Sequence, residues 1–258
     1  MSSGAHILCV ANQKGGVGKT TSALNLAHSL VRQSRRVLLV DLDAQANSTS
    51  VLMADESIAP EQSVYVVFKD KHKADPLILT GRIAGLDLLG AHLKLAEVET
   101  LLAGAVDGFF RLADALQDCR ERYDCIILDC PPNLGMLTVN AFVAANSLLV
   151  PLQTAKFSLD GLTAILDTAT TIQGRFNPGF RVLGALLTMH NARTAISQAF
   201  IEPIAEYIHL FQSRISRAVA VEEAHMMHQT IFEYQPGSKV ALEYETLGQE
   251  VWDAIQEG

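Results

Sequence analysis

The chain has 258 residues, 49% of them hydrophobic and 19% charged, which is enough apolar material for a sizeable core. Its net charge of −8 excludes a generally basic nucleic-acid-binding protein, so any DNA contact must come from a local patch. No apolar run reaches the roughly 18 residues of a membrane span, and the first residues lack the pattern of a signal peptide. Four cysteines lie in or beside apolar segments without zinc-like spacing, which indicates reduced, buried thiols and a cytoplasmic protein.

A glycine-rich loop lies between a predicted strand and a predicted helix near the start of the chain. An apolar run at residues 7–11 precedes QKGGVGKTT at residues 13–21, and apolar residues then recur at helical spacing over 23–31. This order is the context in which the phosphate-loop pattern G-x-x-x-x-G-K-[ST] has a physical meaning, because glycines let backbone N–H groups surround a phosphate. We expect Lys19 to reach the β- and γ-phosphates and the Thr20 hydroxyl to bind Mg²⁺. The predicted nucleotide-binding residues are Gln13, Lys14, Gly15, Gly16, Val17, Gly18, Lys19, Thr20 and Thr21.

Lys14 stands directly before the first glycine, where an ordinary phosphate loop needs no lysine. It is either a solvated surface residue or a second cation, supplied to the phosphates of a neighbouring subunit. The sequence KGGVGKTT resembles the deviant Walker A motif of the ParA/MinD family of ATPases, in which this lysine acts in trans. The resemblance implies catalytic roles for Lys14 and Lys19 and a homodimer that forms on ATP binding.

Carboxylates follow two further predicted strands. The apolar run at 36–41 ends in Asp41-Leu42-Asp43, and the run at 123–129 ends in Asp129 before two prolines. Because the carboxyl ends of parallel strands meet at the ligand-binding edge, we expect all three carboxylates near the phosphate loop. Asp43 would orient or deprotonate the attacking water, and Asp41 and Asp129 would support Mg²⁺ with Thr20. The alternative is that these are solvated strand ends.

The rest of the chain alternates between strand and helix patterns. We predict strands at 86–89, 147–151, 182–188 and 209–215, and helices at 93–102, 109–120, 158–176 (with Ser158 as its cap) and 242–255. Residues 55–82 are expected to be irregular and solvated, and 133–138 is the expected γ-phosphate-sensing segment, with Gly135 giving backbone freedom. The pattern predicts an α/β fold with a doubly wound, mostly parallel sheet flanked by helices, in one domain over residues 1–258.

The C-terminal third carries the candidate DNA contacts. Arg193, Arg214 and Arg217 are either a patch for the DNA backbone or scattered solvated residues. His225 and His228 have only Glu222 as a possible third ligand, a set that does not indicate a metal site. The last predicted helix is acidic and amphipathic, so we expect it to pack on the domain and not to anchor the protein to a membrane.

Four segments in the same order, KGGVGKTT, VDLDAQAN, ILDCPPNLGMLTVNA and residues 151–162, resemble ParA/Soj-type partition ATPases with the P-loop NTPase fold. The resemblance implies ATP and Mg²⁺ as cofactors, an ATP-bound dimer that binds DNA nonspecifically, and a ParB-like partner that stimulates slow hydrolysis. It also implies association with the nucleoid.

The chain departs from this family at several positions. Ala155 and Lys156 stand where many relatives have Glu. The resemblance implies an adenine contact at position 218 and a DNA contact at position 220, which Ala218 and Ala220 put in doubt, and Glu222 adds acid that would repel phosphate beside the expected DNA face. These departures leave open whether the cargo is DNA or another assembly, and whether the protein is a nucleotide-locked scaffold with little hydrolysis. An iron–sulfur carrier of the same superfamily would need a C-x-x-C pair, which the sequence lacks.

Overall fold

The computed structural model describes residues 4–54, 56–153, 159–190 and 201–257. Its described strands form one sheet in the order β3-β4-β2-β5-β1-β6-β7-β8, in which only the β3–β4 pair is antiparallel. The strands are β1 (His6–Val10), β2 (Val37–Asp41), β3 (Leu79–Thr80), β4 (Leu86–Leu89), β5 (Cys125–Asp129), β6 (Ser147–Gln153), β7 (Arg181–His190) and β8 (Leu210–Ser216). The predicted doubly wound, mostly parallel sheet is therefore confirmed.

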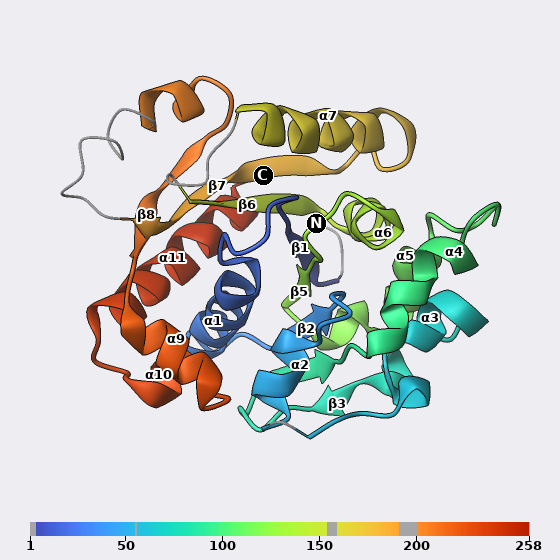
Figure 1. Ribbon diagram of the computed structural model, residues 1–258, viewed down its shortest axis with the longest axis horizontal. Helices are drawn as coiled ribbons and strands as arrows, with labels where there is room; N and C mark the ends of the chain where they lie inside the picture. The colour runs from blue at the N-terminus through green and yellow to red at the C-terminus, as the bar shows by residue number, and fades with distance from the viewer. Residues whose placement is uncertain (1–3, 55, 154–158, 191–200, 258) are drawn as a thin grey trace.

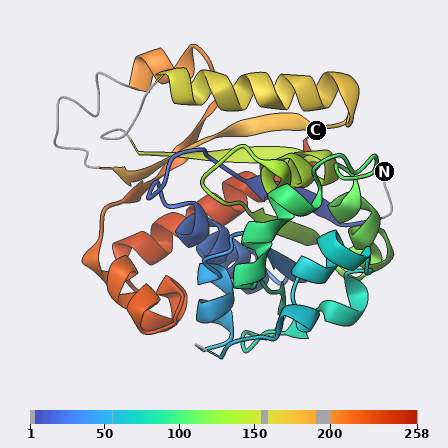
Figure 2. The same cartoon turned by 45° about the vertical axis from the view of Figure 1, so that its right-hand side comes forward.

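Helices cover both faces of this sheet (Figures 1 and 2). The described α-helices are α1 (Lys19–Arg32), α2 (Asn47–Leu52), α3 (Tyr65–Asp70), α4 (Val98–Leu101), α5 (Arg111–Leu116), α6 (Met136–Ala144), α7 (Leu159–Arg175), α9 (Val219–Met226), α10 (Ile231–Tyr234) and α11 (Lys239–Gln256). Helices α3 to α7 pack on one face, and α1, α2, α10 and α11 pack on the other. The central strands are buried on both sides, which explains why they appear in the sequence as continuous apolar runs.

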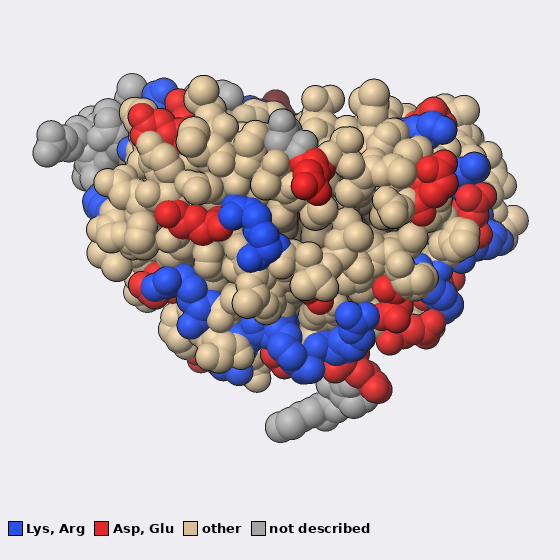
Figure 3. All heavy atoms as spheres, turned by 90° about the horizontal axis from the view of Figure 1, so that it is seen from below, with Lys and Arg blue, Asp and Glu red and all other residues tan. Residues whose placement is uncertain are grey.

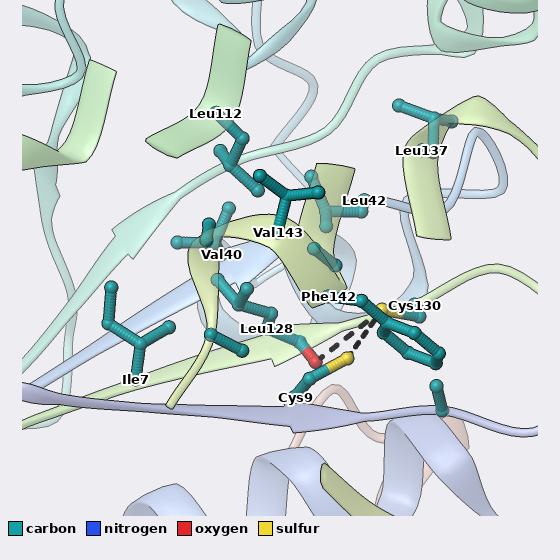
Figure 4. Packing of buried hydrophobic residues seen from close by; sticks show 14 of the residues in the cluster. Ile7, Cys9, Val40, Leu42, Leu112, Leu128, Cys130, Leu137, Phe142 and Val143 are labelled. Atoms are coloured by element: carbon teal, nitrogen blue, oxygen red, sulfur yellow. Dashed lines mark hydrogen bonds between the residues drawn. The ribbon is translucent and has the colours of Figure 1, made fainter. Parts of the chain in front are cut away.

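The core on the α6 side contains two neighbouring cysteines, as Figure 4 shows. The Sγ atoms of Cys9 and Cys130 lie 3.3 Å apart, and both side chains are fully buried among apolar groups such as Phe142 and Leu128. All four cysteines are free and buried, as the sequence indicated. Burial raises the pKa of Cys9, so its thiol stays protonated and unreactive.

Two predicted helices differ from the structure. Residues 93–97 form a 3₁₀ helix (Leu93–Glu97) before the single turn of α4, and residues 117–122 form another (Gln117–Arg122) after α5. Leu95 and Val98 are buried three residues apart, a spacing that suits the tighter 3₁₀ turn.

The segment 55–82, which was expected to be irregular, contains α3, the short strand β3 and two single-turn 3₁₀ helices (Pro60–Gln62 and Asp75–Leu77). The buried run around Phe68 holds α3 on the core, whereas the lysines that follow are exposed, as predicted.

The last helix packs along α1 through a buried stripe, as expected for the acidic amphipathic tail. It also carries two carboxylates to the sheet edge formed by β8. Glu250 accepts hydrogen bonds from the backbone N–H groups of Gln212 (2.6 Å) and Ser213 (2.9 Å). Glu243 accepts hydrogen bonds from the backbone N–H (2.7 Å) and hydroxyl (2.6 Å) of Ser216.

Candidate nucleotide-binding site

The glycine-rich loop connects the carboxyl end of β1 to the first residue of α1. Gly16 and Gly18 have φ angles of 66° and 83°, in the left-handed region that side chains with a Cβ rarely adopt. The backbone N–H of Lys14 donates to Asn12 Oδ1 (3.0 Å), and Asn12 Nδ2 donates to the carbonyl of Pro151 in β6 (2.8 Å). The loop geometry thus depends on both its glycines and its anchor to a neighbouring strand.

A second anchor comes from β7. The Thr188 hydroxyl is buried and contacts two backbone carbonyls, donating to that of Val17 (2.7 Å) and lying 3.2 Å from that of Leu152. Thr188 was not predicted from the sequence, because it lies 171 residues from Val17 in an otherwise ordinary apolar strand.

Lys19 points back into the loop that precedes it. Its ammonium is buried and donates to the Lys14 carbonyl at 2.9 Å. Burial lowers the Lys19 pKa, an effect that the nearby carboxylates of Asp129 and Asp43 oppose. A buried cation at the glycine-rich loop suits a phosphate ligand.

Asp129 ends β5 and is fully buried. Its Oδ2 accepts a hydrogen bond from the Ser48 hydroxyl at 2.7 Å, whereas Oδ1 accepts none from the residues that the structure describes. Burial and repulsion from Asp41 raise the Asp129 pKa to about 8. The Thr20 hydroxyl, in the first turn of α1, lies near enough to Asp129 to lower its pKa, in opposition to burial. A buried carboxylate oxygen with no partner at hydrogen-bond distance among the described residues, next to a hydroxyl, fits a divalent cation.

Asp41 lies opposite Asp129 in the register of β2 and β5. Its two oxygens accept hydrogen bonds from the backbone N–H of Asp43 (3.1 Å) and from the N–H and hydroxyl of Thr49 (2.9 and 2.7 Å). Burial raises its pKa to about 6. Because both oxygens hold backbone in place, Asp41 positions Asp43 and α2, and any support for Mg²⁺ from it is indirect.

The loop glycines, Lys19, Thr20, Asp43 and Thr188 line a cavity of about 530 Å³, a volume in the usual range for a small-molecule site, whereas Asp41 and Asp129 are not among its lining residues. The cavity has a phosphate end, at the loop and Asp43, and a second end under α9 with a mostly apolar lining. Its lining residues are Gly15, Gly16, Gly18, Lys19, Thr20, Thr21, Asp43, Gln45, Asn47, Pro132, Thr188, Met189, Ile215, Ser216, Arg217, Ala218, Val221, Glu222, His225, Met226 and Tyr244.

The structure therefore brings most of the predicted nucleotide site together. Gln13, Lys14 and Val17 belong to the loop but do not line the cavity. Of the three predicted DNA contacts, Arg214 is exposed on β8, Arg217 lines the cavity, and Arg193 lies outside the described residues, as do Ala155, Lys156 and Ser158. The residues that sequence reasoning missed come from β7 and α9, where only the departures at Ala218 and Glu222 gave a signal.

The segment between β5 and α6 also lies at the cavity, through Pro132. The Gly135 N–H donates to Asn133 Oδ1 (3.1 Å), and the first N–H of α6, from Met136, donates to Glu99 Oε1 (2.7 Å). A Cβ on Gly135 would lie only 1.9 Å from that Glu99 oxygen. This oxygen is the far end of the exposed Glu99 side chain, which could move aside, and Gly135 has an extended backbone (φ −83°, ψ −167°), so the contact does not by itself require glycine.

A glycine-rich loop between strand and helix, a lysine inside it and a carboxylate at the end of a neighbouring strand together define a P-loop nucleoside triphosphatase. The comparisons with known proteins agree. Residues 5–182 match a family model described as an AAA domain. Relatives include the sporulation initiation inhibitor protein Soj of Bacillus subtilis, 38% identical over 95% of this chain and 97% of its own. The chromosome-partitioning ATPase Soj of Thermus thermophilus is 39% identical over 97% of this chain and 96% of its own.

This chain belongs to the ParA/Soj family of partition ATPases. Among solved structures it is similar to one described as cobyrinic acid a,c-diamide synthase of Mycobacterium smegmatis with bound ADP and magnesium. The two chains are 31% identical and superpose with a TM-score of 0.84. The match covers 98% of this chain and 96% of the solved one. No helix within the described ranges is long and apolar enough to cross a membrane.

Proposed function

We propose that this protein is an ATP-dependent, dimerising ATPase switch that binds DNA nonspecifically and partitions chromosome or plasmid DNA with a ParB-like partner. The observation that carries the nucleotide part is a single cavity lined by Lys19, Thr20 and Asp43, with the buried Asp129 beside it. Its relatives are named as partitioning ATPases, and the solved Mycobacterium smegmatis structure holds ADP and magnesium.

Each residue of this site has a distinct role in the proposed reaction. The loop N–H groups and Lys19 bind the β- and γ-phosphates, and the lysine stabilises the charge that develops as the terminal bond breaks. Asp43, held by the N–H bond to Asp41, orients the attacking water and accepts its proton. Thr20 and Asp129 would hold Mg²⁺, which supplies charge neutralisation on the phosphate oxygens when bound.

Lys14 completes the site in a dimer. Lys14 lies one residue before the first glycine of the loop, and its backbone N–H donates a hydrogen bond to the Asn12 side chain. We propose that its side chain reaches the phosphates bound by the partner protomer, so that hydrolysis requires two copies and the protein acts as a switch. Two apolar side chains of α9 are exposed, Val219 and the cavity-lining Met226, and a second copy would cover them.

DNA binding would rest on a local surface, because the overall charge is negative. Basic and acidic side chains lie beside one another on the face in Figure 3, and most surface arginines on the described chain pair with carboxylates. Arg214 faces outward from the edge strand β8, and it is the described arginine that we propose to contact DNA phosphates.

The test is an electrophoretic shift on nonspecific DNA with ATP, ADP or no nucleotide, repeated over a salt series. We expect binding only with ATP, weakening steeply as salt rises, and a weaker shift for Arg214→Ala than for the control Arg36→Ala. A protein that dimerises with ATP but shifts no DNA at low salt would instead support a ParA-like ATPase that positions another cargo. Dimerisation without turnover would support a nucleotide-locked scaffold.

A further inference from the structure

Helix α9 forms one wall of the nucleotide cavity but is weakly held by apolar packing. Four of its residues, Val221, Glu222, His225 and Met226, line the cavity at the end away from the phosphate loop. Of its eight residues only Ala224 is buried, and a gap of about 10 Å³ lies between α9 and α1. Ala220 and Val221 pack against the core but are only partly buried, so polar contacts at the ends of α9 contribute to fixing its position.

An arginine from the β3–β4 edge of the sheet contacts the C-terminal end of α9, close to where Thr230 and Ile231 hydrogen-bond to α1. Arg82, in the turn between β3 and β4, donates to the carbonyl of His228 just after α9 and to the carboxylate of Glu233 in α10. Its Nε also donates to the carbonyl of Val51 near the C-terminal end of α2, at 3.3 Å. The guanidinium is 30% exposed and Glu233 is 22% exposed, so the pair is partly shielded from solvent.

A second contact joins the same elements. Ser50 Oγ of α2 lies 3.0 Å from His228 Nδ1, and His228 has a left-handed φ of 51°. This conformation is common just after a helix, and here the Gln229 N–H donates to the Ala224 carbonyl of α9 (2.9 Å). Figures 1 and 2 show the turn between α9 and α10 beside α2, which follows Asp41 and Asp43 in the chain.

We propose that Arg82 is a positioning residue for nucleotide binding, which holds α9 over the nucleoside end of the cavity by joining the α9–α10 turn to α2. Its hydrogen-bond partners among the described residues, Val51, His228 and Glu233, do not line the cavity, so it acts by keeping α9 in the binding-competent position. If loss of Arg82 reduced the population of that position to about a tenth, nucleotide affinity would fall about tenfold. The inference rests on nucleotide binding by this site and is independent of DNA or partner binding.

The test separates the nucleoside end of the cavity from the phosphate end. Calorimetric titration would measure the Kd of Mg-ADP and of inorganic tripolyphosphate, which can contact only the phosphate loop. For Arg82→Ala we expect the ADP Kd and the ATP KM to rise about tenfold, while the tripolyphosphate Kd and kcat stay within about twofold. Arg82→Lys should recover part of the loss, because it keeps the charge but not the bidentate geometry.

Matched variants keep the test decisive. Arg36→Ala removes a surface arginine that pairs with Asp124 at the start of β2, and it should bind both ligands as the unmodified protein does. Glu233→Gln should give a smaller loss in the same direction, and it replaces Arg82→Ala if circular dichroism shows that the latter is unfolded. Unchanged ADP affinity in the folded Arg82 or Glu233 variant, or equal losses for ADP and tripolyphosphate, would overturn the inference. Failure of the unmodified protein to bind ADP would instead overturn the proposed nucleotide function.

Discussion

Replacing Asp129 with asparagine should stabilise the protein in the absence of nucleotide and metal, although it removes a predicted Mg²⁺ ligand. Asp129 is fully buried, and burial together with the charge of Asp41 raises its pKa from 3.8 to about 8. In the unfolded chain this carboxyl ionises near pH 3.8, whereas in the folded chain it stays protonated until about pH 8. The free energy of unfolding therefore falls by about 1.4 kcal/mol for each pH unit between these values.

The size of the effect at neutral pH follows from this range. From pH 3.8 to pH 7 the carboxyl of Asp129 lowers stability by about 4 kcal/mol in total. Asparagine does not ionise, and its side-chain oxygen can still accept the hydrogen bond from Ser48. We expect Asp129→Asn to raise the free energy of unfolding by up to about 4 kcal/mol at pH 7, with the difference vanishing near pH 4.

Urea denaturation in EDTA at several pH values between 4 and 8 would measure this difference. Asp124→Asn is the control, and it should lower the free energy of unfolding at pH 7, because hydrogen bonds from Arg36 lower the pKa of Asp124. A lowered carboxyl pKa contributes stability above the unfolded value, which is lost as the pH falls. Equal or lower stability of Asp129→Asn at pH 7, or a difference that does not change with pH, would refute the reasoning.

Four further substitutions test the other residues of the site. Lys19→Ala should abolish ATP-dependent dimerisation in size-exclusion chromatography. Lys14→Ala should keep much of the nucleotide binding and lose hydrolysis, and normal phosphate release by it would contradict a role in trans. Asp43→Ala should accumulate a dimer that retains ATP, detectable by chromatography of the extracted nucleotide. Thr188→Val should lower the free energy of unfolding in urea by about 1–2 kcal/mol, because the buried Val17 carbonyl loses its donor. An unchanged urea midpoint would contradict a stabilising role for this hydrogen bond.

The sequence was sufficient for the phosphate end of the site because each of its parts is local. The loop and the strand ends at Asp43 and Asp129 are continuous segments whose spacing alone predicts where the chain turns. The buried strands were equally predictable, since continuous apolar runs leave few alternatives in a parallel sheet.

The nucleoside end was not predictable in this way. Its walls come from β7, β8, α9 and α11, segments far apart in the sequence, and nothing next to Thr188 marks that residue as part of a site. The predicted metal role of Asp41 illustrates the same limit. Its position at a strand end was correctly recognised, but only the structure shows that Thr49 and the Asp43 backbone engage both of its oxygens.

The two carboxylates of α11 also restrict how copies of this protein can associate. An exposed sheet edge has unpaired backbone groups to which a strand of another chain can bind, and repeated addition of strands leads to fibres and aggregates. Glu243 and Glu250 already engage N–H groups of Gln212, Ser213 and Ser216, so an incoming strand would first have to displace two charged side chains. Self-association is thereby directed away from open-ended polymerisation through β8.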